Sequence, residues 1–303
     1  KIETNPSTYH LGYMLGPRIN AGGRVGKCSH GANLLLNSDP KKAFQLANEL
    51  DNFNKERKLI EENLLDRIMS QAKKNLNDPL LVLEGKNWHE GVIGIVASRL
   101  KDKFNKPVII ISIKDQVGKA SARSILGFDI GSTIIAALNI GIILKGGGHK
   151  MAGGFSIDVK NIDKFKDFIF KRFNKLNLIE KEMKPLILDS KIAPTAVNLD
   201  FFDKIDTLSP FGAGNPEPKF IIENLKPLNS KIVGEKHIKS TLIGMEGTII
   251  KTIAFNAVNN EIGSYLLKMN KKIFNIAGKL SLNEWRGEKN VEFIIDDISV
   301  NKK

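Results

Sequence analysis

The sequence contains few of the features that mark extracellular or membrane proteins. Cys28 is its single cysteine, which rules out a disulfide within the chain and favours a reducing compartment. No segment reaches the roughly 18 consecutive apolar residues that a membrane-spanning helix needs. Residues 1–6 lack both an initiator Met and the apolar core of a signal peptide. We therefore expect a cytoplasmic protein without a membrane role, and a chain that comes from the middle of a longer protein.

Metal-ligating residues do not occur in the patterns typical of metal sites. The five histidines of the chain are His10, His30, His89, His149 and His237. None of them shows the close spacing to Asp or Cys that a metal site uses. Asp296 and Asp297 are adjacent on an expected strand, so their side chains point to opposite faces. We therefore predict no metal-binding group in this chain.

Positive charge is abundant and unevenly distributed. The chain has a formal net charge of +13. Residues 1–180 contain 28 Lys and Arg against 18 Asp and Glu, whereas residues 181–303 contain 18 against 15. Clustered Lys and Arg neutralise backbone phosphates and release counterions, so this excess favours a polyanion, above all a nucleic acid, as the partner. A lysine-rich composition inherited from an AT-rich genome is the alternative explanation.

Five of the nine residues in the segment GGGHKMAGG, residues 146–154, are glycine. Glycine adopts positive φ and lacks a Cβ atom, so successive backbone N–H groups can converge on a phosphate close to the main chain. We therefore predict a phosphate-binding loop, with a histidine and a lysine at its rim as further donors. The alternative is a tight turn between two buried strands. The candidate residues are Gly146, Gly147, Gly148, His149 and Lys150.

A second glycine-rich segment, GYMLGPRINAGGRVG at residues 12–26, contains Arg18 and Arg24. Its small side chains predict a loop from which both guanidinium groups reach one anion. Arginine suits this role because its planar fork donates two parallel hydrogen bonds to a phosphate. The alternative is that the two arginines cap helix ends or face water.

The segment GKASARS, residues 118–124, predicts a strand with one polar face. Residues two apart on a strand share a face, so Lys119, Ser121 and Arg123 project together. A hydroxyl and a guanidinium group on one face can clamp a terminal phosphate. The alternative is the ordinary solvated face of a half-buried sheet.

Residues 39–77 show the apolar spacing of three and four that is typical of one long amphipathic helix. Asp39 as N-cap and Pro40 in the first turn mark its start, and its narrow apolar stripe predicts a connector between two domains. The segments that follow alternate between short apolar strands and helices, which predicts a compact α/β domain over residues 79–180. His89 precedes the first of these helices, and we expect it to have a structural role.

The pattern changes after a charged linker over residues 174–184. Short β-type runs then recur with one helix near residues 261–269, and roughly five strands with an inserted helix predict a small barrel of the OB type. Such barrels bind single strands through aromatic and basic residues. The candidate aromatic residues are Phe255, Phe274, Trp285 and Phe293. For each of them alone, a place in the barrel core is the favoured alternative.

Five motifs follow one another along the chain: LGPRINAGGR, NWHEGVIGIVASRL, GKASARS, GGGHKMAGGFSI and LSPFGAGNPEPKF. In this order and spacing they resemble the bacterial RecJ family of single-strand-specific DNA exonucleases, within the DHH superfamily. The resemblance covers essentially the whole chain and implies an α/β plus β fold. Its expected parts are the tail of an amino-terminal DHH catalytic domain over residues 1–38, a connector helix over 39–78, a DHH-associated α/β domain over 79–180 and an OB-type nucleic-acid-binding barrel over 181–303.

For the whole enzyme, the resemblance implies 5′-to-3′ hydrolysis of single-stranded DNA in repair and recombination, with Mn²⁺ or Mg²⁺ ions that activate water. The family's metal ligands lie in the amino-terminal DHH domain, expected before Lys1, so we expect this chain alone to be inactive. By analogy, Ser121 and Arg123 with Arg24 or Arg18 hold the 5′ phosphate, and His149 lies near the scissile phosphate. The barrel is expected to bind the downstream strand.

Two other functions stay open. A related oligonucleotide phosphoesterase would share the glycine segment, although we do not expect it to carry the LSPFGAGNPEPKF segment or a barrel. A non-catalytic single-stranded-DNA-binding module would use the same basic residues without hydrolysis. On the RecJ-like interpretation, the partners are single-stranded DNA, the amino-terminal DHH domain and other repair proteins.

Overall fold

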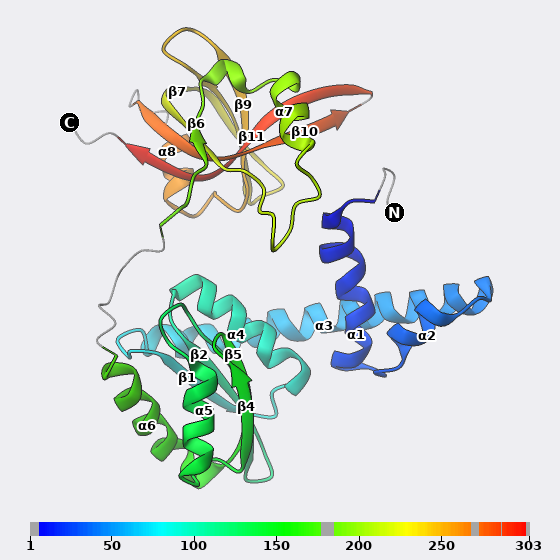
Figure 1. Ribbon diagram of the computed structural model, residues 1–303, viewed down its shortest axis with the longest axis vertical. Helices are drawn as coiled ribbons and strands as arrows, with labels where there is room; N and C mark the ends of the chain where they lie inside the picture. The colour runs from blue at the N-terminus through cyan, green and yellow to red at the C-terminus, as the bar shows by residue number, and fades with distance from the viewer. Residues whose placement is uncertain (1–5, 177–184, 268–272, 286, 301–303) are drawn as a thin grey trace. The chain divides into compact units, whose positions relative to one another are not determined.

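A computed structural model describes residues 6–176, 185–267, 273–285 and 287–300 (Figure 1). They belong to two compact units, Lys1–Lys181 and Glu182–Lys303. The first unit is an α/β domain preceded by helices, and the second is a β-barrel. Most of the expected linker, residues 177–184, and the side chain of Trp285 lie outside the described part of the chain.

The first unit begins with helices where the sequence predicts a loop. These are η1 (His10–Leu15), a π-helix that leads directly into α1 (Gly16–Val25), and α2 (His30–Leu36). The loop predicted over residues 12–26 is therefore wrong. Pro17 lies in the first turn of α1, where its missing N–H is no disadvantage. Gly22 packs against Leu50, which lies in the long helix that follows α2, and a Cβ atom on Gly22 would come within 2.8 Å of the Lys27 carbonyl oxygen.

The long helix that the sequence predicts is α3 (Pro40–Lys74). The Asp39 carboxylate caps it by accepting a hydrogen bond from the backbone N–H of Lys41. In its first half, Leu50 lies against α1, whereas in its second half Ile68 and Ala72 join the core of the α/β domain. The helix thus connects the amino-terminal helices to that domain.

The α/β domain is built on a five-stranded sheet in the order β1-β2-β3-β5-β4. Its elements are β1 (Leu81–Lys86), α4 (Glu90–Phe104), β2 (Val108–Lys114), β3 (Val117–Arg123), α5 (Ile130–Asn139), β4 (Lys145–His149), β5 (Ala152–Asp158), the short η2 (Val159–Asn161) and α6 (Ile162–Asn174). β1 and β2 are parallel and joined by α4, and the other pairs are antiparallel. The predicted alternation of strands and helices is confirmed.

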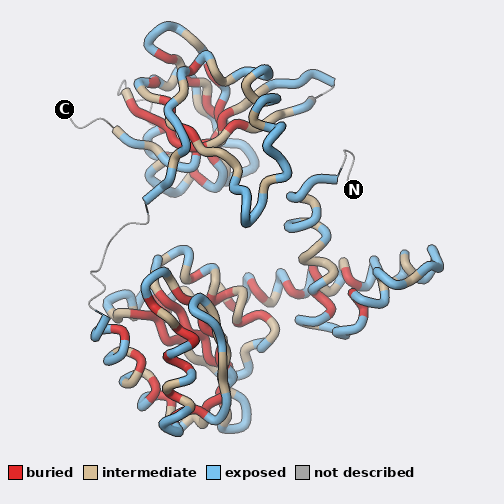
Figure 2. Tube along the Cα trace, viewed as in Figure 1, coloured by how far each residue is buried: buried red, intermediate tan, exposed pale blue. Residues whose placement is uncertain are grey.

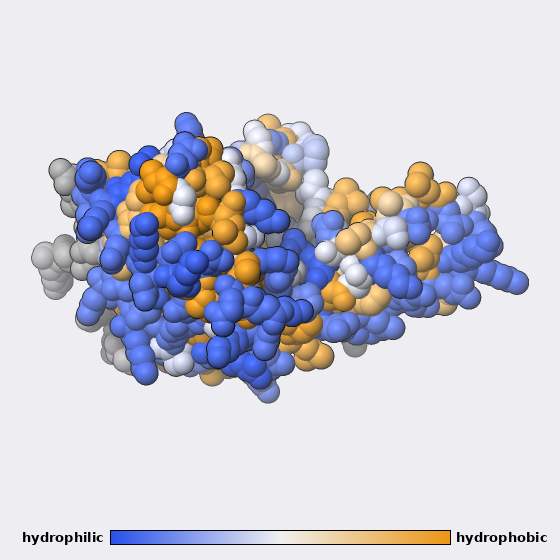
Figure 3. Space-filling model, turned by 90° about the horizontal axis from the view of Figure 1, so that it is seen from below, coloured by the Kyte–Doolittle hydropathy of each residue, from blue (hydrophilic) through white to orange (hydrophobic). Residues whose placement is uncertain are grey.

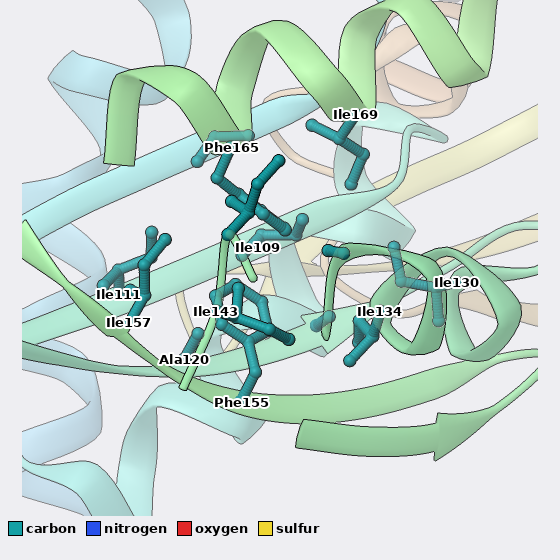
Figure 4. Packing of buried hydrophobic residues seen from close by; sticks show 14 of the residues in the cluster. Ile109, Ile111, Ala120, Ile130, Ile134, Ile143, Phe155, Ile157, Phe165 and Ile169 are labelled. Carbon is teal, nitrogen blue, oxygen red and sulfur yellow. The ribbon is translucent and has the colours of Figure 1, made fainter. Parts of the chain in front are cut away.

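Helices cover the two faces of this sheet differently. On one face, α5 and α6 pack on a core that includes Ile109, Phe155 and Phe165 (Figure 4). On the other face, α4 and the second half of α3 pack over β1 and β2, around residues such as Ile110. Strand β3 has one apolar and one polar face. On the apolar face, Ala120 and the residues two positions before and after it are small and buried, whereas the residues between them are polar.

The glycine segment is a β-hairpin, so the predicted loop is wrong. The alternative, a tight turn between two buried strands, is right about the turn and wrong about the burial, because no residue of β4 is buried. β4 and β5 pair through Gly147 opposite Gly154 and Gly148 opposite Gly153. Glycine is needed here for close packing. A Cβ atom on Gly153 would lie 2.4 Å from Cδ1 of Ile134, which belongs to α5. The missing side chains thus let α5 approach the sheet.

The second unit is a closed five-stranded barrel with the OB topology that the sequence predicts. Its elements are β6 (Ser190–Lys191), η3 (Pro194–Ala196), α7 (Leu199–Asp206), β7 (Phe220–Val233), β8 (His237–Ile243), β9 (Ile249–Ala254), α8 (Glu261–Leu267), β10 (Phe274–Trp285) and β11 (Glu288–Val300). The sheet order is β10-β11-β9-β8-β7-β6, and the β10–β7 pairing closes the barrel. β9 and β11 run parallel, and α8 is the helix inserted between β9 and β10.

The barrel core contains two of the aromatic residues considered for strand binding. Phe274 and Phe293 are buried together with Ile222 and Ile276, so they fill the core rather than contact DNA. Figure 2 shows buried stretches (red) along the strands of the barrel. Phe255 is 52% exposed and meets the ring of His237 edge to face. Of the described aromatic candidates, Phe255 is thus the one placed to contact a ligand.

Apolar residues also lie on the surface of the first unit. Tyr9 and Tyr13 stack on each other and are exposed, and so are Leu35 and Leu36 at the end of α2. Figure 3 shows apolar residues (orange) among hydrophilic ones (blue) on the face of the chain seen from below. No helix within the described ranges has the length and apolar character required to cross a bilayer.

Candidate phosphate-binding site

The two arginines of the first glycine-rich segment have different partners. Arg18 forms an ion pair with Asp51 of α3, with 2.8 Å between Nε and Oδ1, and it also donates to the Met14 carbonyl oxygen at 2.7 Å. Arg24, at the end of α1, instead donates from Nη1 to the Gly91 carbonyl oxygen at 3.3 Å. Its main chain also meets the start of α4, because a Cβ atom on Gly91 would lie 2.1 Å from the Arg24 carbonyl oxygen. Of the two, Arg24 is therefore the one that reaches α4.

Arg123, at the end of β3, is held by three oxygen atoms. Its Nε donates to Ser98 Oγ at 3.1 Å, and its Nη1 donates to Ser121 Oγ at 3.2 Å and to the Ala122 carbonyl oxygen at 2.8 Å. Ser98 belongs to α4, one turn after Gly94. A Cβ atom on Gly94 would lie 2.9 Å from Ser121 Oγ, so this glycine lets the polar face of β3 lie against the helix.

Arg123 and Arg24 are cationic groups close enough to affect each other. Burial, and to a lesser extent the positive charge of Arg24, lowers the pKa of Arg123 below its ordinary value. A guanidinium group remains charged in spite of this. Within the described ranges, no carboxylate lies within ion-pair distance of either arginine. Two neighbouring guanidinium groups without a carboxylate are suited to an anion that supplies the missing negative charge.

The strand register places the polar residues of β3 in rows with residues of β5 and β4. Directly opposite residues share a face of the sheet. The rows are Lys119–Ser156–Lys145, Ser121–Gly154–Gly147 and Arg123–Ala152–His149. The middle row has almost no side chains, and a Cβ atom on Gly147 would meet nothing within 4 Å. The two outer rows carry the cationic groups and the histidine, on either side of this glycine floor.

A pocket of about 470 Å³ opens on this face, next to α4. Lys119, Ser121 and Lys145 line it together with Glu90 and Ile93 from the first turn of the helix. The Glu90 carboxylate forms an ion pair with Lys119 at 2.7 Å between Oε2 and Nζ. The pocket therefore has a glycine floor, one apolar wall and cationic side chains at its rim.

The structure brings together some of the predicted site residues and separates others. Ser121, Arg123 and Arg24 meet around the start of α4 and the end of β3. His149 shares the row of Arg123 two strands away, which is about 10 Å at the usual strand spacing. Its Nδ1 accepts a hydrogen bond from the Met151 backbone N–H at 3.3 Å.

The remaining predicted residues have structural neighbours. Gly146 and Gly148 face α5 and the hairpin main chain, where a Cβ atom would come within 2.7 Å of Phe155 Cβ and 2.4 Å of the Ala152 carbonyl oxygen, respectively. Lys150 lies in the hairpin turn, and its carbonyl oxygen accepts from the N–H of Ile130 at 3.2 Å, at the start of α5. Of the three glycines considered, Gly147 is thus the one open to a ligand.

Sequence reasoning missed the contribution of α4 and of Lys145. Gly94 and Ser98 are four residues apart in the NWHEGVIGIVASRL motif, a spacing that places two small residues on one helix face. That spacing is the signal that could have identified them.

Other polar residues of the same motif have structural contacts. Arg99 of α4 forms an ion pair with the buried Glu61 of α3, with 2.6 Å between Nε and Oε1, and this pair connects α4 to the connector helix. His89 caps α4 by accepting from the N–H of Gly91, which confirms its structural role.

Metal ligation finds no support in the described part of the chain. Within it, no three residues of the types His, Cys, Asp and Glu lie together in an arrangement that could hold an ion. Asp296, considered from the sequence, forms an ion pair with Lys219 at 2.6 Å. The described residues therefore do not fit a divalent cation.

The barrel has a basic surface of its own. A pocket of about 310 Å³ lies on β7, β8, β9 and β11 and is lined by Lys231, Lys239 and Lys251 among other polar residues. Lys239 forms an ion pair with Glu292 at 3.1 Å. The surface is hydrophilic and spread over several strands, as in barrels that contact a nucleic-acid backbone.

Each of the two units matches the model of a known protein family. The model of the DHHA1 domain matches residues 77–175, and the model of the RecJ OB domain matches residues 188–297. The single-stranded-DNA-specific exonuclease RecJ of Escherichia coli is 34% identical over 304 residues, which cover 95% of this chain. The chain belongs to the RecJ family.

Solved RecJ structures share the fold. Crystal structures of Thermus thermophilus RecJ in complex with Mn²⁺ and with Mg²⁺ match 98% of this chain with TM-scores of 0.82 and 0.81, at 26% sequence identity. The chain spans 51% of the E. coli RecJ sequence and 42% of the Mn²⁺-bound RecJ chain. The similarity to RecJ thus covers both units of this chain, and it covers about half of the length of the RecJ relatives.

Proposed function

We propose that this chain is the phosphate- and strand-binding part of a single-stranded-DNA-specific 5′-to-3′ exonuclease. The observation that carries the proposal is the pair of guanidinium groups, Arg24 and Arg123, that lie near each other with Ser121 and have no carboxylate partner in the described part of the chain. In this proposal they bind the 5′-terminal phosphate of the strand.

Each residue then has a specific part in binding. Arg123 is held by Ser98 and Ser121 through Nε and Nη1, so Nη2 remains to donate to a phosphate from a guanidinium group that is already oriented. Arg24 adds the second positive charge, and a doubly charged terminal phosphate is favoured over an internal phosphodiester because it has more charge to neutralise. The glycine floor lets the strand lie close to the sheet, and His149, with Nδ1 already hydrogen-bonded, presents Nε2 to the scissile phosphate.

Mn²⁺ or Mg²⁺ would activate water for the hydrolysis when bound. The described residues do not fit such an ion, so we propose that its ligands belong to the amino-terminal DHH domain, as the RecJ resemblance implies. In this division of roles the present chain binds and orients the strand, and the barrel holds the downstream nucleotides through its lysines and Phe255.

Two measurements on the 303-residue chain test the proposal. The first compares its affinity for one oligonucleotide carrying a 5′ phosphate or a 5′ hydroxyl group, and we expect tighter binding of the phosphorylated strand. Equal affinity would contradict recognition of the strand end. The second is a nuclease assay with Mn²⁺, before and after addition of a separately produced amino-terminal portion of a RecJ relative.

The nuclease assay also separates the alternatives. We expect no hydrolysis by the chain alone and hydrolysis after mixing. Activity of the chain alone would show that the metal ligands lie within it. Single-strand binding without any gain on mixing would favour a non-catalytic binding module, for which the exposed barrel lysines would be sufficient.

A further inference from the structure

Lys145 is the cationic residue of the site that neither the sequence motifs nor the 5′-phosphate site explains. It lies at the start of β4, directly opposite Ser156, which is itself opposite Lys119 on β3. All three side chains therefore share the face of the sheet that carries Ser121 and Arg123. Lys145 is exposed, and in the described part of the chain it has no carboxylate within ion-pair distance.

The two lysines stand on opposite sides of a buried hydroxyl group. Ser156 is 7% exposed and lines the 470 Å³ pocket together with Lys119 and Lys145. Adjacent strands are about 5 Å apart, so the Cα atoms of the two lysines lie about 10 Å apart and their flexible side chains can converge on one anion above Ser156. The pocket also includes Ser121, which belongs to the 5′-phosphate site.

The row of lysines lies at a distance that suits a second phosphate of the same strand. Residues two apart on an antiparallel strand are about 7 Å apart, so Lys119 is one such step from Ser121 and two steps from Arg123. This is comparable to the separation of phosphates along an extended single strand. The floor between the rows carries Gly154 and Gly147 and leaves space for the sugar that links them.

We propose that Lys119, Lys145 and Ser156 form a second phosphate subsite, which binds another phosphate of the single strand whose 5′ end lies at Arg123. The Glu90 carboxylate holds Lys119 when no DNA is bound, and the incoming phosphate competes with it for this lysine. The inference rests on the proposed function, because the direction of the strand is set by the 5′-phosphate site.

The experiment uses the 303-residue chain and two ligands, thymidine 5′-monophosphate and the 5′-phosphorylated thymidine trinucleotide, in titrations followed by NMR. Lys145→Ala is expected to leave the affinity for the monophosphate unchanged and to weaken trinucleotide binding about fivefold. The slope of log affinity against log salt concentration for the trinucleotide should fall by the amount that corresponds to about one phosphate contact. The matched control is Lys164→Ala, which removes another exposed lysine, from α6 on the other side of the sheet, and should change neither affinity.

Glu90→Gln supplies a test of opposite sign. It removes the negative charge that competes for Lys119, so trinucleotide affinity should rise, while monophosphate affinity stays the same. The proposal is overturned if Lys145→Ala weakens both ligands equally, if it weakens neither, or if Glu90→Gln lowers trinucleotide affinity. Failure of the 5′-phosphate site looks different: the wild-type chain would then bind the monophosphate no better than thymidine, while the effect of Lys145 on the trinucleotide would persist.

Discussion

The candidate site of the α/β domain and a group of lysines on the barrel differ in whether their cationic side chains have carboxylate partners. On the barrel, Lys191, Lys219, Lys239 and Lys279 each form an ion pair with a carboxylate. At the candidate site of the α/β domain, Arg24, Arg123 and Lys145 have no such partner among the described residues. Net charge alone does not reveal this contrast. On the proposed function, the arrangement of charges, more than their number, distinguishes the phosphate site from a generally basic surface.

The largest expected effect tests whether the two units act separately. Phe293→Ala empties a fully buried position in the barrel core and should lower the free energy of unfolding of the barrel by about 3 to 5 kcal/mol. Urea unfolding followed by NMR signals of each unit measures this loss. Preference for a 5′ phosphate should survive in the α/β domain, and its disappearance would contradict separate roles.

Phe255→Ala is the matched control for that substitution. Because this ring is exposed, its removal should change the free energy of unfolding by less than about 0.5 kcal/mol. It should still weaken binding of single-stranded DNA, since an exposed aromatic ring offers a surface for base stacking. Unchanged DNA affinity would assign Phe255 to its contact with His237 alone.

The next effect concerns the strand end. Arg123→Ala should weaken binding of 5′-phosphorylated strands by about 1.5 to 3 kcal/mol, because a charge-assisted hydrogen bond is lost. Binding of 5′-hydroxyl strands should change little, as measured by fluorescence anisotropy. Lys251→Ala on the barrel is the counterpart and should weaken both strands alike. An equal loss for both ends with Arg123→Ala would indicate general backbone contact.

A smaller effect on the free energy of unfolding should distinguish Gly148, which packs against the hairpin main chain, from Gly147, which faces the candidate site. Gly148→Ala should lower the free energy of unfolding by about 1 to 3 kcal/mol, because its Cβ atom would lie 2.4 Å from the Ala152 carbonyl oxygen. Gly147→Ala has open space and should leave stability within about 0.5 kcal/mol while weakening DNA binding. Thermal unfolding and anisotropy measure the two outcomes. The reverse order of stabilities would mean that the hairpin faces are assigned incorrectly.

The smallest effect concerns Arg18, which the sequence places with Arg24 and the structure pairs with Asp51. Hydrogen bonds from Lys55 and then from Arg18 lower the pKa of Asp51. Ionised Asp51 therefore stabilises the fold above its ordinary pKa, and this stability is lost as the pH falls through the lowered pKa. Asp51→Asn should cost about 0.5 kcal/mol at pH 7, and its unfolding curve should converge with that of the wild type in acid.

Binding measurements complete that test. Asp51→Asn should leave the preference for a 5′ phosphate unchanged, since Arg24 and not Arg18 reaches the start of α4. A weaker preference would place Arg18 in the site after all.

The sequence alone was sufficient for most of the elements from residue 40 onward and for much of the predicted site chemistry. Hydrophobic periodicity identified α3 and the α/β alternation, because amphipathic helices and half-buried strands need only the local order of apolar residues. Alternation along β3 placed Lys119, Ser121 and Arg123 on one face for the same reason. The five motifs also led to the RecJ family, which the comparisons support.

Tertiary packing decided the structural role of the glycine-rich segments and which cationic side chains come together at the candidate site. Four of the five glycines of residues 12–26 lie in helices, and those of residues 146–154 lie in a hairpin. Several of them, such as Gly22 and Gly148, are needed where main chains come close together, and composition does not distinguish a flexible loop from such a tight contact. The separation of Arg18 from Arg24, the support of Arg123 by Ser98, and the row that adds Lys145 all depend on contacts between distant segments. Local sequence does not contain such distances, since they arise only when helices and strands pack into one core.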